Sequence, residues 1–481
     1  MNFRIVSRFL GILFFILSLS MFTSLIPALF YGENETVINF SISTLIGLLL
    51  GIAFFVWGKK AGVTINRRDA LAVVAIGWIG FGVVGAIPFM LEEVLTNPID
   101  AFFETVSGFT TTGSTVITDL DKVSYGLLYW RSLTQWLGGM GIIVLFIAVL
   151  PQLGIGVRQM FRSEVPGPIT EGLKPKLKET ASILWKIYLG ITLAEILLLW
   201  AAGMSIFDAV CHSLTTMATG GYSTRDESIA YYSNPLIQII IIVFMLAAGV
   251  NFGLYYQVAK GKWKMPFKNS EFRVYIGLLL AAGLVLSVSI MHLHTNFFDA
   301  VRHGFFQSVS IGTTTGYATD DFDIYPPFAK VLLVVLMFIG GSAGSTGGGM
   351  KVSRIMVLVK AAYHEVYHTF RPQVVVSLKV GKNVISESVV KSISAFFIIF
   401  ILIFVLGTLF LTALGLDMVT AFSATIAALG NIGPGLAKVG ATQHYAHVPY
   451  AGKLFLAIAM ILGRLELFTI LVLFSPKFWK S

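Results

Sequence analysis

The sequence predicts an all-α integral membrane protein, in which two N-terminal helices precede four repeats of helix, pore helix, filter and helix in a pseudo-fourfold arrangement. Hydrophobic residues make up 56% of the 481 positions and charged residues only 12%, which is too little polar surface for a soluble globule of this size. Apolar stretches of about 20 residues, long enough to cross a bilayer core, recur along the chain. Four shorter segments of mixed polarity resemble one another.

Ten apolar stretches qualify as membrane-spanning segments. They lie near residues 9–31, 38–58, 70–91, 127–150, 183–203, 235–259, 275–292, 328–363, 390–414 and 449–473. The first is expected to be a retained helix rather than a signal peptide, because it exceeds 20 residues and another span follows at once. The eighth is interrupted in its middle by glycines.

The basic residues indicate the orientation of the chain. Most Lys and Arg residues fall in alternate connections, whereas acids such as Asp119, Asp121, Asp320 and Asp321 fall in the opposite ones. Because basic flanks stay cytoplasmic, both termini are predicted to be cytoplasmic. The same sorting explains the net charge of +9, so membrane lipid is the expected environment and no nucleic-acid partner is expected.

The four shorter segments form an internal repeat. The intervals Asp100–Gly113, Asp208–Gly221 and Thr420–Gly433 are each 13 residues, and Asp299–Gly316 is four residues longer. Such repetition indicates one supersecondary unit used several times around or across an axis. The predicted division is an N-terminal transmembrane helix pair at 1–65, followed by pore repeats at 66–155, 156–262, 263–372 and 373–481.

Each repeat combines a half-helix with a glycine-bearing strand. Asp100, Asp208 and Asp299 are expected to cap the outer ends of the half-helices, whose carbonyl ends then point into the membrane and favour a cation. Glycine lets the following backbone turn its carbonyls toward an axis, where four strands replace the hydration shell of an ion. The predicted cation-binding filter residues are Thr111, Thr112, Gly113, Thr219, Gly220, Gly221, Thr314, Thr315, Gly316, Asn431, Ile432 and Gly433. The alternative is a set of re-entrant turns without a carbonyl ring.

The interrupted eighth span is predicted to unwind at residues 340–351, because each glycine inside a helix costs about 1 kcal/mol relative to alanine. This loop follows the third filter, so we expect an intramembrane gate beneath the pore; the alternative is a flexible kink. The predicted gate residues are Gly340, Gly341, Gly344, Gly347, Gly348, Gly349, Lys351 and Arg464. The loop does not match a phosphate-binding loop, because Met350 separates Gly349 from Lys351.

Two charges fall inside the last predicted span. Arg464 and Glu466 must face protein or water, because an unpaired charge in lipid is costly. Arg464 is expected in the inner vestibule or against the gate, and the alternative is a structural partner for Glu466 or Glu195.

One motif suggests a different class of protein. His364 to His368 match the zinc-protease pattern His-Glu-x-x-His, which favours an intramembrane metalloprotease as the alternative enzyme. The segment lies among basic residues without a convincing third ligand, so we predict that the chain is not an enzyme.

The repeat motifs resemble the superfamily of Trk, Ktr and HKT potassium transporters over nearly the whole chain. The resemblance rests on Ser107–Gly113, Ala218–Thr224, Thr313–Thr319, Gly430–Gly435, the break at 340–349 and Arg464. The extra N-terminal helix pair favours the TrkH branch. Gly220-Gly221 departs from the Thr-Gly of the first and third filters, which puts the side-chain contribution there in doubt.

The resemblance implies potassium uptake across a bacterial inner membrane. It also implies a homodimer with one pore per subunit and control by a cytosolic TrkA-like ring that binds NAD and ATP, with no cofactor in this chain. Two mechanisms remain open: a gated channel, or a proton- or sodium-coupled symporter. Coupling needs buried titratable groups, for which Glu195, Glu466 and Asp417 are candidates, so the channel is favoured. A non-conducting membrane scaffold is a third hypothesis.

Overall fold

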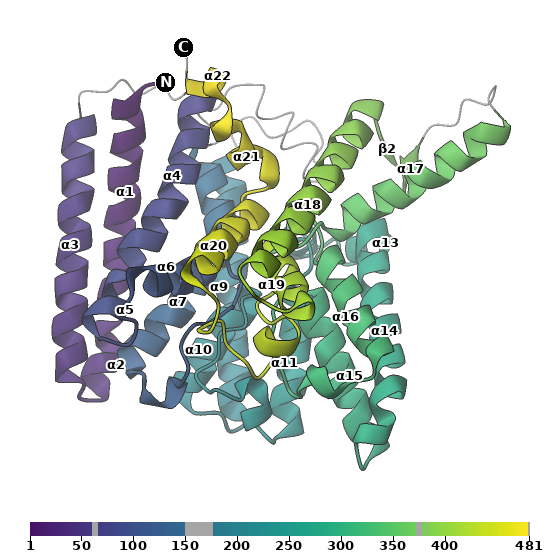
Figure 1. Ribbon diagram of the computed structural model, residues 1–481, viewed down its shortest axis with the longest axis horizontal. Helices are drawn as coiled ribbons and strands as arrows, with labels where there is room; N and C mark the ends of the chain where they lie inside the picture. The colour runs from purple at the N-terminus through teal and green to yellow at the C-terminus, as the bar shows by residue number, and fades with distance from the viewer. Residues whose placement is uncertain (60–65, 150–176, 372–377, 382, 480–481) are drawn as a thin grey trace.

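The structure is a computed structural model that describes residues 1–59, 66–149, 177–371, 378–381 and 383–479. The helices stand side by side in a broad bundle, and α1 begins at the same end at which α22 lies (Figure 1). The predicted repeat boundaries near 65, 155 and 372 fall at or within segments outside the described residues. The predicted boundary near 262 falls between α12 and α13.

The N-terminal helices pack closely because glycines remove side chains from their interface. They are α1 (Phe3–Phe22), α2 (Leu25–Phe30) and α3 (Asn34–Gly58). A Cβ atom added at Gly11 would lie 2.5 Å from Phe55 N and 2.7 Å from Gly51 O. The close approach of α1 and α3 therefore depends on this residue.

The rest of the described chain runs through four similar sets of helices. The first set is α4 (Arg67–Gly85), α5 (Ile87–Leu91), α6 (Pro98–Phe109) and α7 (Tyr125–Val149). The second is α9 (Leu177–Ala201), α10 (Ile206–Met217), α11 (Pro235–Ala248) and α12 (Phe252–Ala259). The third is α13 (Met265–Lys268), α14 (Ser270–Ile290), α15 (Phe297–Gly312), α16 (Pro327–Ile339) and α17 (Val352–Phe370). The fourth is α18 (Glu387–Ala413), α19 (Met418–Gly430), α20 (Tyr450–Arg464), α21 (Leu467–Leu471) and α22 (Pro476–Trp479).

The predicted all-α fold is confirmed. Among the described residues, one short hairpin departs from the all-α prediction. It consists of β1 (Lys379–Val380) and β2 (Asn383–Val384), which pair antiparallel with Lys379 opposite Val384. The third half-helix is longer, as expected: α15 has 16 residues, whereas α6 and α10 each have 12.

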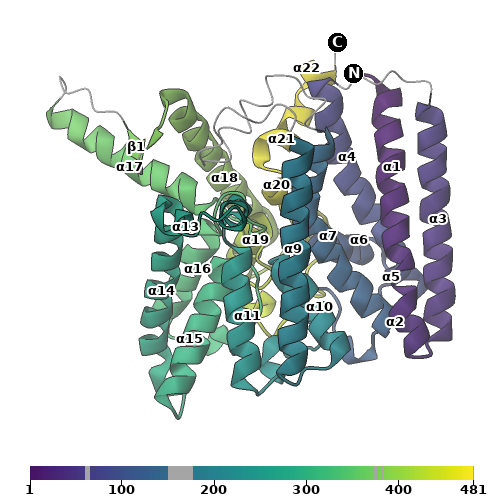
Figure 2. The same cartoon turned by 180° about the vertical axis from the view of Figure 1, so that it is seen from behind.

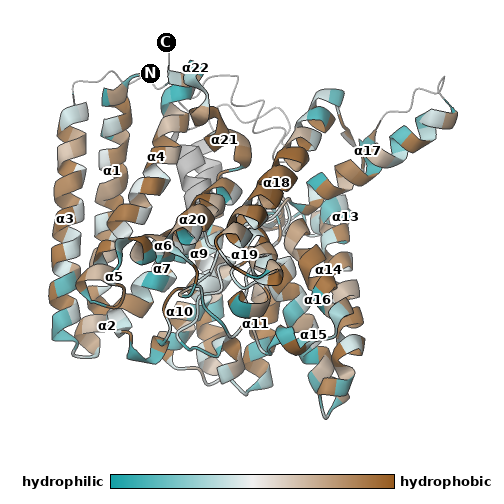
Figure 3. Ribbon diagram, in the orientation of Figure 1, coloured by the Kyte–Doolittle hydropathy of each residue, from teal (hydrophilic) through white to brown (hydrophobic). Residues whose placement is uncertain are grey.

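Six described helices are long and apolar enough to cross a membrane by themselves, and two further helix pairs qualify as bent spans. Apolar residues cover the flanks of the bundle, including α14 and α18, as expected of surfaces that face lipid (Figure 3). The eighth span breaks between Ile339 and Val352, which confirms the predicted interruption. The chain is a multi-pass membrane protein.

The tenth span differs from its expected continuous form. The helix bends by 116° between Arg464 and Leu467. Glu466 in this bend has φ 60°, a left-handed conformation that ends a helix of L-residues. The sixth span also bends, by 93°, between α11 and α12.

We expect Gly11→Val to force α1 and α3 apart and to lower the stability of the protein by about 1–3 kcal/mol, because extra methyl groups overpack a filled interface. Unfolding in detergent would measure the change. Gly277→Val is the matched control, since nothing lies within 4 Å of a Cβ atom added at Gly277 on α14. Equal effects of the two substitutions would contradict the packing argument.

Candidate ion pathway and filter

Three of the four half-helices begin three residues upstream of their predicted caps, and no cap was predicted for the fourth. The N-cap residues of α6, α10, α15 and α19 are Asn97, Ser205, Asn296 and Asp417. The prediction that Asp100, Asp208 and Asp299 are the caps was therefore wrong. These acids occupy the first helical turn, where a negative charge still favours the helix dipole.

The four filters share one backbone conformation. Each predicted filter is a triplet of residues. The first residue of each triplet has a positive φ although it is not glycine, and the third is a glycine that also has a positive φ. The left-handed non-glycine residues are Thr111, Thr219, Thr314 and Asn431, with φ of 53°, 53°, 63° and 52°. The glycines are Gly113, Gly221, Gly316 and Gly433, with φ of 86°, 74°, 82° and 98°.

Threonine at positive φ is an outlier, because its branched Cβ clashes with the backbone. In the third filter, the surrounding bonds hold this conformation at Thr314: Thr315 N donates to Ser310 O at 2.8 Å, and Gly348 N donates to Thr314 Oγ1 at 2.6 Å. Strain of this kind persists where the fold overdetermines it, and it is concentrated at functional sites. The recurrence of the same outlier in three filters marks this region as the functional site.

The four filters contact one another in a closed order. A Cβ atom added at Gly113 would collide with Gly220 O of the second filter, and one at Gly221 would collide with Thr315 O of the third. A Cβ at Gly316 would collide with Ile432 O of the fourth filter. One at Gly433 would lie 2.7 Å from Thr112 O of the first. Each glycine thus lets its filter rest against a carbonyl of the next.

Most filter carbonyls have no protein donor. Among the described residues, no hydrogen bond reaches the backbone oxygens of the following predicted filter residues: Thr111, Thr112, Gly113, Thr219, Gly221, Thr314, Thr315, Gly316, Asn431 and Ile432. The threonine side chains of these filters are buried. Buried carbonyls require a polar partner, and at membrane depth a cation or water that they surround meets this need. The ring is therefore suited to bind a dehydrated cation.

Gly220 and Gly433 differ from the other predicted filter residues. Gln135 Nε2 donates to Gly220 O at 2.8 Å. Ser114 Oγ and Tyr445 Oη donate to Gly433 O at 3.0 Å and 2.8 Å. These two carbonyls are already satisfied by the protein, so they hold the ring together rather than offering a free ligand.

A cavity of about 210 Å³ lies against the ring, and it is lined by all four recurring glycines together with Arg131, Arg225 and Asp226. The glycines that line it from the first three filters are half-buried, whereas the threonines that precede them are buried. The glycine end of the ring therefore faces this cavity.

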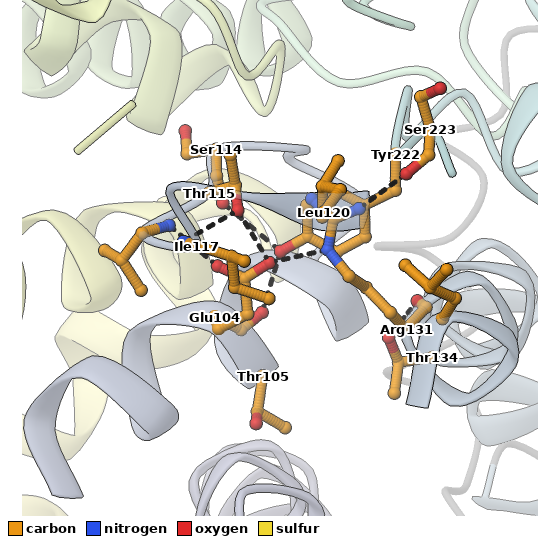
Figure 4. Close-up of polar contacts among 12 residues, drawn as sticks. Glu104, Thr105, Ser114, Thr115, Ile117, Leu120, Arg131, Thr134, Tyr222 and Ser223 are labelled. Atoms are coloured by element: carbon orange, nitrogen blue, oxygen red, sulfur yellow. Dashed lines mark hydrogen bonds and ion pairs between the residues drawn. The ribbon is translucent and has the colours of Figure 1, made fainter. Parts of the chain in front are cut away.

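A buried ion pair holds the first filter against the second (Figure 4). Arg131 Nε lies 2.7 Å from Glu104 Oε1, and the two side chains are 3% and 0% exposed. Glu104 also accepts from Val116 N at 2.8 Å, and Arg131 Nη1 donates to Ser223 O at 2.9 Å. The Arg131 guanidinium lies over the Tyr222 ring at 3.5 Å from its centre.

Glu104 and Arg131 were not among the functional residues predicted from the sequence. The signal for their ion pair was present, because Glu104 interrupts an apolar half-helix and Arg131 lies inside the predicted fourth span. An ionisable residue within a span marks a functional site unless a structural partner explains it.

Other side chains connect neighbouring repeats. The Tyr222 hydroxyl donates to Glu104 O at 2.9 Å, and the Tyr317 hydroxyl donates to His212 O at 3.1 Å. In both cases the tyrosine follows a filter glycine and reaches the half-helix of the preceding repeat. Asn431 Nδ2 donates to Thr112 Oγ1 at 3.0 Å and so joins the fourth filter to the first.

The glycine-rich loop at 340–351 lies against the ends of three half-helices. Thr346 Oγ1 donates to Met217 O and Ala248 O, each at 3.1 Å. A Cβ atom added at Gly348 would collide with Gly430 O, and one at Gly347 would lie 2.9 Å from Thr313 O. The loop therefore contacts the ends of the second, third and fourth half-helices, at the side of the ring opposite to the filter glycines.

Charged side chains fix this loop from two sides. Arg464 Nη1 donates to Thr346 O at 2.6 Å, and Nη2 donates to Gly138 O at 3.0 Å. Glu271 Oε1 accepts from Ala343 N at 2.7 Å. The Lys351 ammonium donates to Gly347 O. Arg464 thus contacts the loop, as one of its two predicted roles requires.

The acidic candidates for ion coupling lie in three different settings. Glu466 Oε2 pairs with Arg354 Nη2 at 2.5 Å. Asp417 is exposed and caps α19 by accepting from Thr420 N at 3.0 Å, a bond that lowers the pKa of its carboxyl. Glu195 is fully buried.

The His-Glu-x-x-His motif lies on α17, where the His364 and His368 rings stack with 6.2 Å between their centres. The group of three potential metal ligands found in the described part of the chain is Asp119, Asp121 and Asp226, far from this motif in sequence. The described residues thus supply no third ligand for a zinc site at the histidines.

Residues 39–481 match the sequence profile of the TrkH family, which is described as a family of cation transport proteins. The chain belongs to this family. The Trk system potassium uptake protein TrkH of Salmonella typhimurium is 39% identical over 488 residues, which cover 100% of both chains. The Trk system potassium uptake protein TrkG of Escherichia coli is 37% identical, with 99% of both chains covered.

The crystal structure of the potassium transporter TrkH from Vibrio parahaemolyticus has the same fold, with a TM-score of 0.91 at 38% identity and 100% of each chain covered. These similarities confirm the predicted fold class and the predicted family. Since TrkH proteins are transporters, the prediction that the chain is not an enzyme is confirmed as well.

We expect Gly221→Ala to abolish cation flux into proteoliposomes. The added Cβ atom would collide with Thr315 O and would also strain a residue at φ 74°. Gly415→Ala is the matched control, because Gly415 has φ 95° but nothing lies within 4 Å of an added Cβ atom. It shares the backbone strain of roughly 1–2 kcal/mol without the collision. Loss of flux in both variants would contradict a role for the carbonyl contact.

We expect Glu104→Gln to destabilise the protein by about 3–5 kcal/mol, because it leaves the buried Arg131 charge without its partner. Unfolding in detergent would measure this effect. Glu387→Gln removes the corresponding charge from an exposed pair with Lys391, in which the side chains are 81% and 75% exposed. An equal effect of the two substitutions would argue against the buried pair as the main tie between the first two filters.

Proposed function

We propose that this chain takes up potassium across a bacterial inner membrane through a gated, channel-like pore. The observation that carries the proposal is the closed ring of filter carbonyls, most of which have no protein donor. Potassium is the ion named for the relatives of similar length. The proposed repeats span 66–155, 156–262, 263–372 and 373–481 in a pseudo-fourfold arrangement after the 1–65 helix pair, with both termini cytoplasmic.

Rescue of a potassium-transport-deficient cell tests this proposal. The wild type should restore growth on low potassium, and Gly113→Asp should fail to do so, because it places a charged side chain against Gly220 O at the mouth of the ring. Equal rescue by both proteins would instead favour a non-conducting scaffold. Surface expression of both proteins has to be matched for this comparison.

Within this proposal, the loop at 340–351 is the gate. It lies against the inner ends of three filters, and its glycines give it a backbone that moves at low cost. Arg464 holds this loop in its closed position by donating a hydrogen bond to Thr346 O. The predicted gate residues within the loop are Gly340, Gly341, Gly344, Gly347, Gly348, Gly349 and Lys351. Opening therefore requires this hydrogen bond to break or to move with the loop.

We expect Arg464→Ala to raise resting rubidium flux through proteoliposomes, because the loop loses a hydrogen bond from a charged donor, a contribution of about 1.5–3 kcal/mol. Lys391→Ala is the control, since it removes an exposed cation outside the loop. A resting flux equal to that of the wild type would show that Arg464 does not hold the gate closed.

A channel is favoured over a proton- or sodium-coupled symporter. Of the three candidates for ion coupling, Glu466 is paired with Arg354 and Asp417 is an exposed helix cap. Glu195 is the candidate that remains, and it is buried. Single-channel recording in a bilayer separates the two mechanisms. Unitary currents that reverse at the potassium equilibrium potential support the channel, and a reversal potential that follows the proton or sodium gradient supports the symporter.

The proposed assembly is a homodimer with a cytosolic TrkA-like ring that binds NAD and ATP. The name of the relatives as parts of a Trk system supports a partner protein. Helix α17 projects from the bundle in both views (Figures 1 and 2). It carries exposed apolar side chains at helical spacing along one stripe. These are Val359, Tyr363, Val366 and Phe370. Cross-linking of cysteines introduced on this stripe would test whether two copies meet there.

A further inference from the structure

Glu195 is the intramembrane carboxyl group that the proposed pore does not use. It lies in α9, within the span Ser182–Ala201, and its side chain is 0% exposed. Helix α9 lies beside α10 and α11 on the face of the bundle seen in Figure 2. No donor among the described residues forms a hydrogen bond of regular geometry with either carboxyl oxygen. A carboxylate without partners is far more costly to bury than a neutral acid.

The polar neighbour of this carboxyl is the Thr216 hydroxyl, in the last turn of α10. Thr216 Oγ1 donates to His212 O at 2.7 Å and also lies 3.5 Å from Tyr317 Oη, the longer of the two contacts. While its hydrogen is engaged by His212 O, the hydroxyl oxygen keeps lone pairs that can accept from a protonated Glu195, whereas a carboxylate has nothing to donate. A protonated carboxyl supplies the missing hydrogen.

The helix dipole gives a second and independent reason for a neutral group. Thr216 precedes Met217, the last residue of α10, and the carbonyl end of a helix carries partial negative charge. A negative carboxylate beside this end would be repelled. A neutral acid that donates a hydrogen bond is favoured in the same place.

The ionisable neighbours offer no compensating cation. Tyr188 on α9 and Tyr317 after the third filter are the titratable groups that interact with Glu195. On α10, Asp208 contacts Arg225. Both ring nitrogens of His212 are bonded, to Asp208 O and Ser223 Oγ.

The remaining elements packed against α9 add no cation either, within the part of the chain that the structure describes. Arg131 on α7 is paired with Glu104, and α11 carries no ionisable residue. On α12, the Tyr255 hydroxyl donates to Ala247 O. Cys211 on α10 is a buried thiol. Arg464 interacts electrostatically with Tyr188, but its guanidinium donates hydrogen bonds to two backbone carbonyls.

We propose that Glu195 binds a proton and is a neutral carboxylic acid that donates a hydrogen bond to Thr216 behind the second filter. This proton is resident rather than transported: it supports the last turn of α10, whose Met217 carbonyl also accepts from Thr346 of the glycine-rich loop. The site stands whether or not the ring selects potassium, because it rests on the packing of α9 against α10.

Infrared difference spectroscopy tests the protonation directly. The full-length protein is reconstituted in lipid, and the spectrum of Glu195→Gln is subtracted from that of the wild type at neutral pH. The expected difference is the loss of a protonated-carboxyl C=O band that shifts in deuterated water. Glu387→Gln, at an exposed carboxylate, is the control and should remove only carboxylate bands. Loss of carboxylate bands in Glu195→Gln would overturn the proposal.

Thr216→Val supplies a second test that keeps Glu195 in place. With its acceptor removed, the carboxyl band should move to the position of an acid without a hydrogen bond. An unchanged band would overturn the assigned bond to Thr216. This test remains informative if Glu195→Gln does not fold.

Stability against pH gives a third readout, independent of transport. The folded protein holds a proton that the unfolded chain releases above the ordinary glutamate pKa of about 4.3, so stability should fall as the pH rises from there through neutral pH. Glu195→Gln, which resembles the neutral acid in shape, should remove this part of the pH dependence while it leaves uptake at neutral pH unchanged. A pH dependence identical in the wild type and the variant would overturn the proposal. Loss of uptake in both proteins would speak against the proposed function alone.

Discussion

The structure depends on one constraint: backbone carbonyls placed at membrane depth must find a positive or donating partner. Four half-helices bring the four filters to a common centre, and most of the filter carbonyls have no donor from the protein. Glycine at the end of each filter allows the strands to meet, because a side chain there would collide with the neighbouring strand. Helix ends, strained threonines and cross-repeat bonds all serve to hold these carbonyls in place.

The repeats solve this constraint with different side chains. The first two filters are joined by the buried pair of Glu104 and Arg131, whereas Asn431 joins the fourth to the first through an amide. Asn tolerates the left-handed conformation better than the threonines that occupy the equivalent places. The glycine-rich loop contacts the second, third and fourth half-helices, and Arg464 holds it from the fourth repeat. Equivalent backbones therefore have unequal surroundings.

The sequence was sufficient to predict the fold class, six unbroken spans, the longer third half-helix and the break after Ile339, because hydrophobic length and glycine runs are local signals. It misplaced the helix caps, since the aspartates resemble caps although Asn97, Ser205 and Asn296 precede them by three residues. It missed the bend at Glu466, a residue whose ion-pair partner Arg354 is distant in the sequence. It also could not show that Gln135 satisfies Gly220 O, a contact that joins residues 85 positions apart.

The closed order of the filter contacts has a consequence for how such a protein can evolve. Each recurring glycine is restricted by a carbonyl of the following repeat rather than by its own strand. A substitution in one filter is therefore relieved most directly by a change in the next filter. The four filter segments are therefore mutually dependent, and the side chain that each recurring position can carry is limited by the backbone of a different filter.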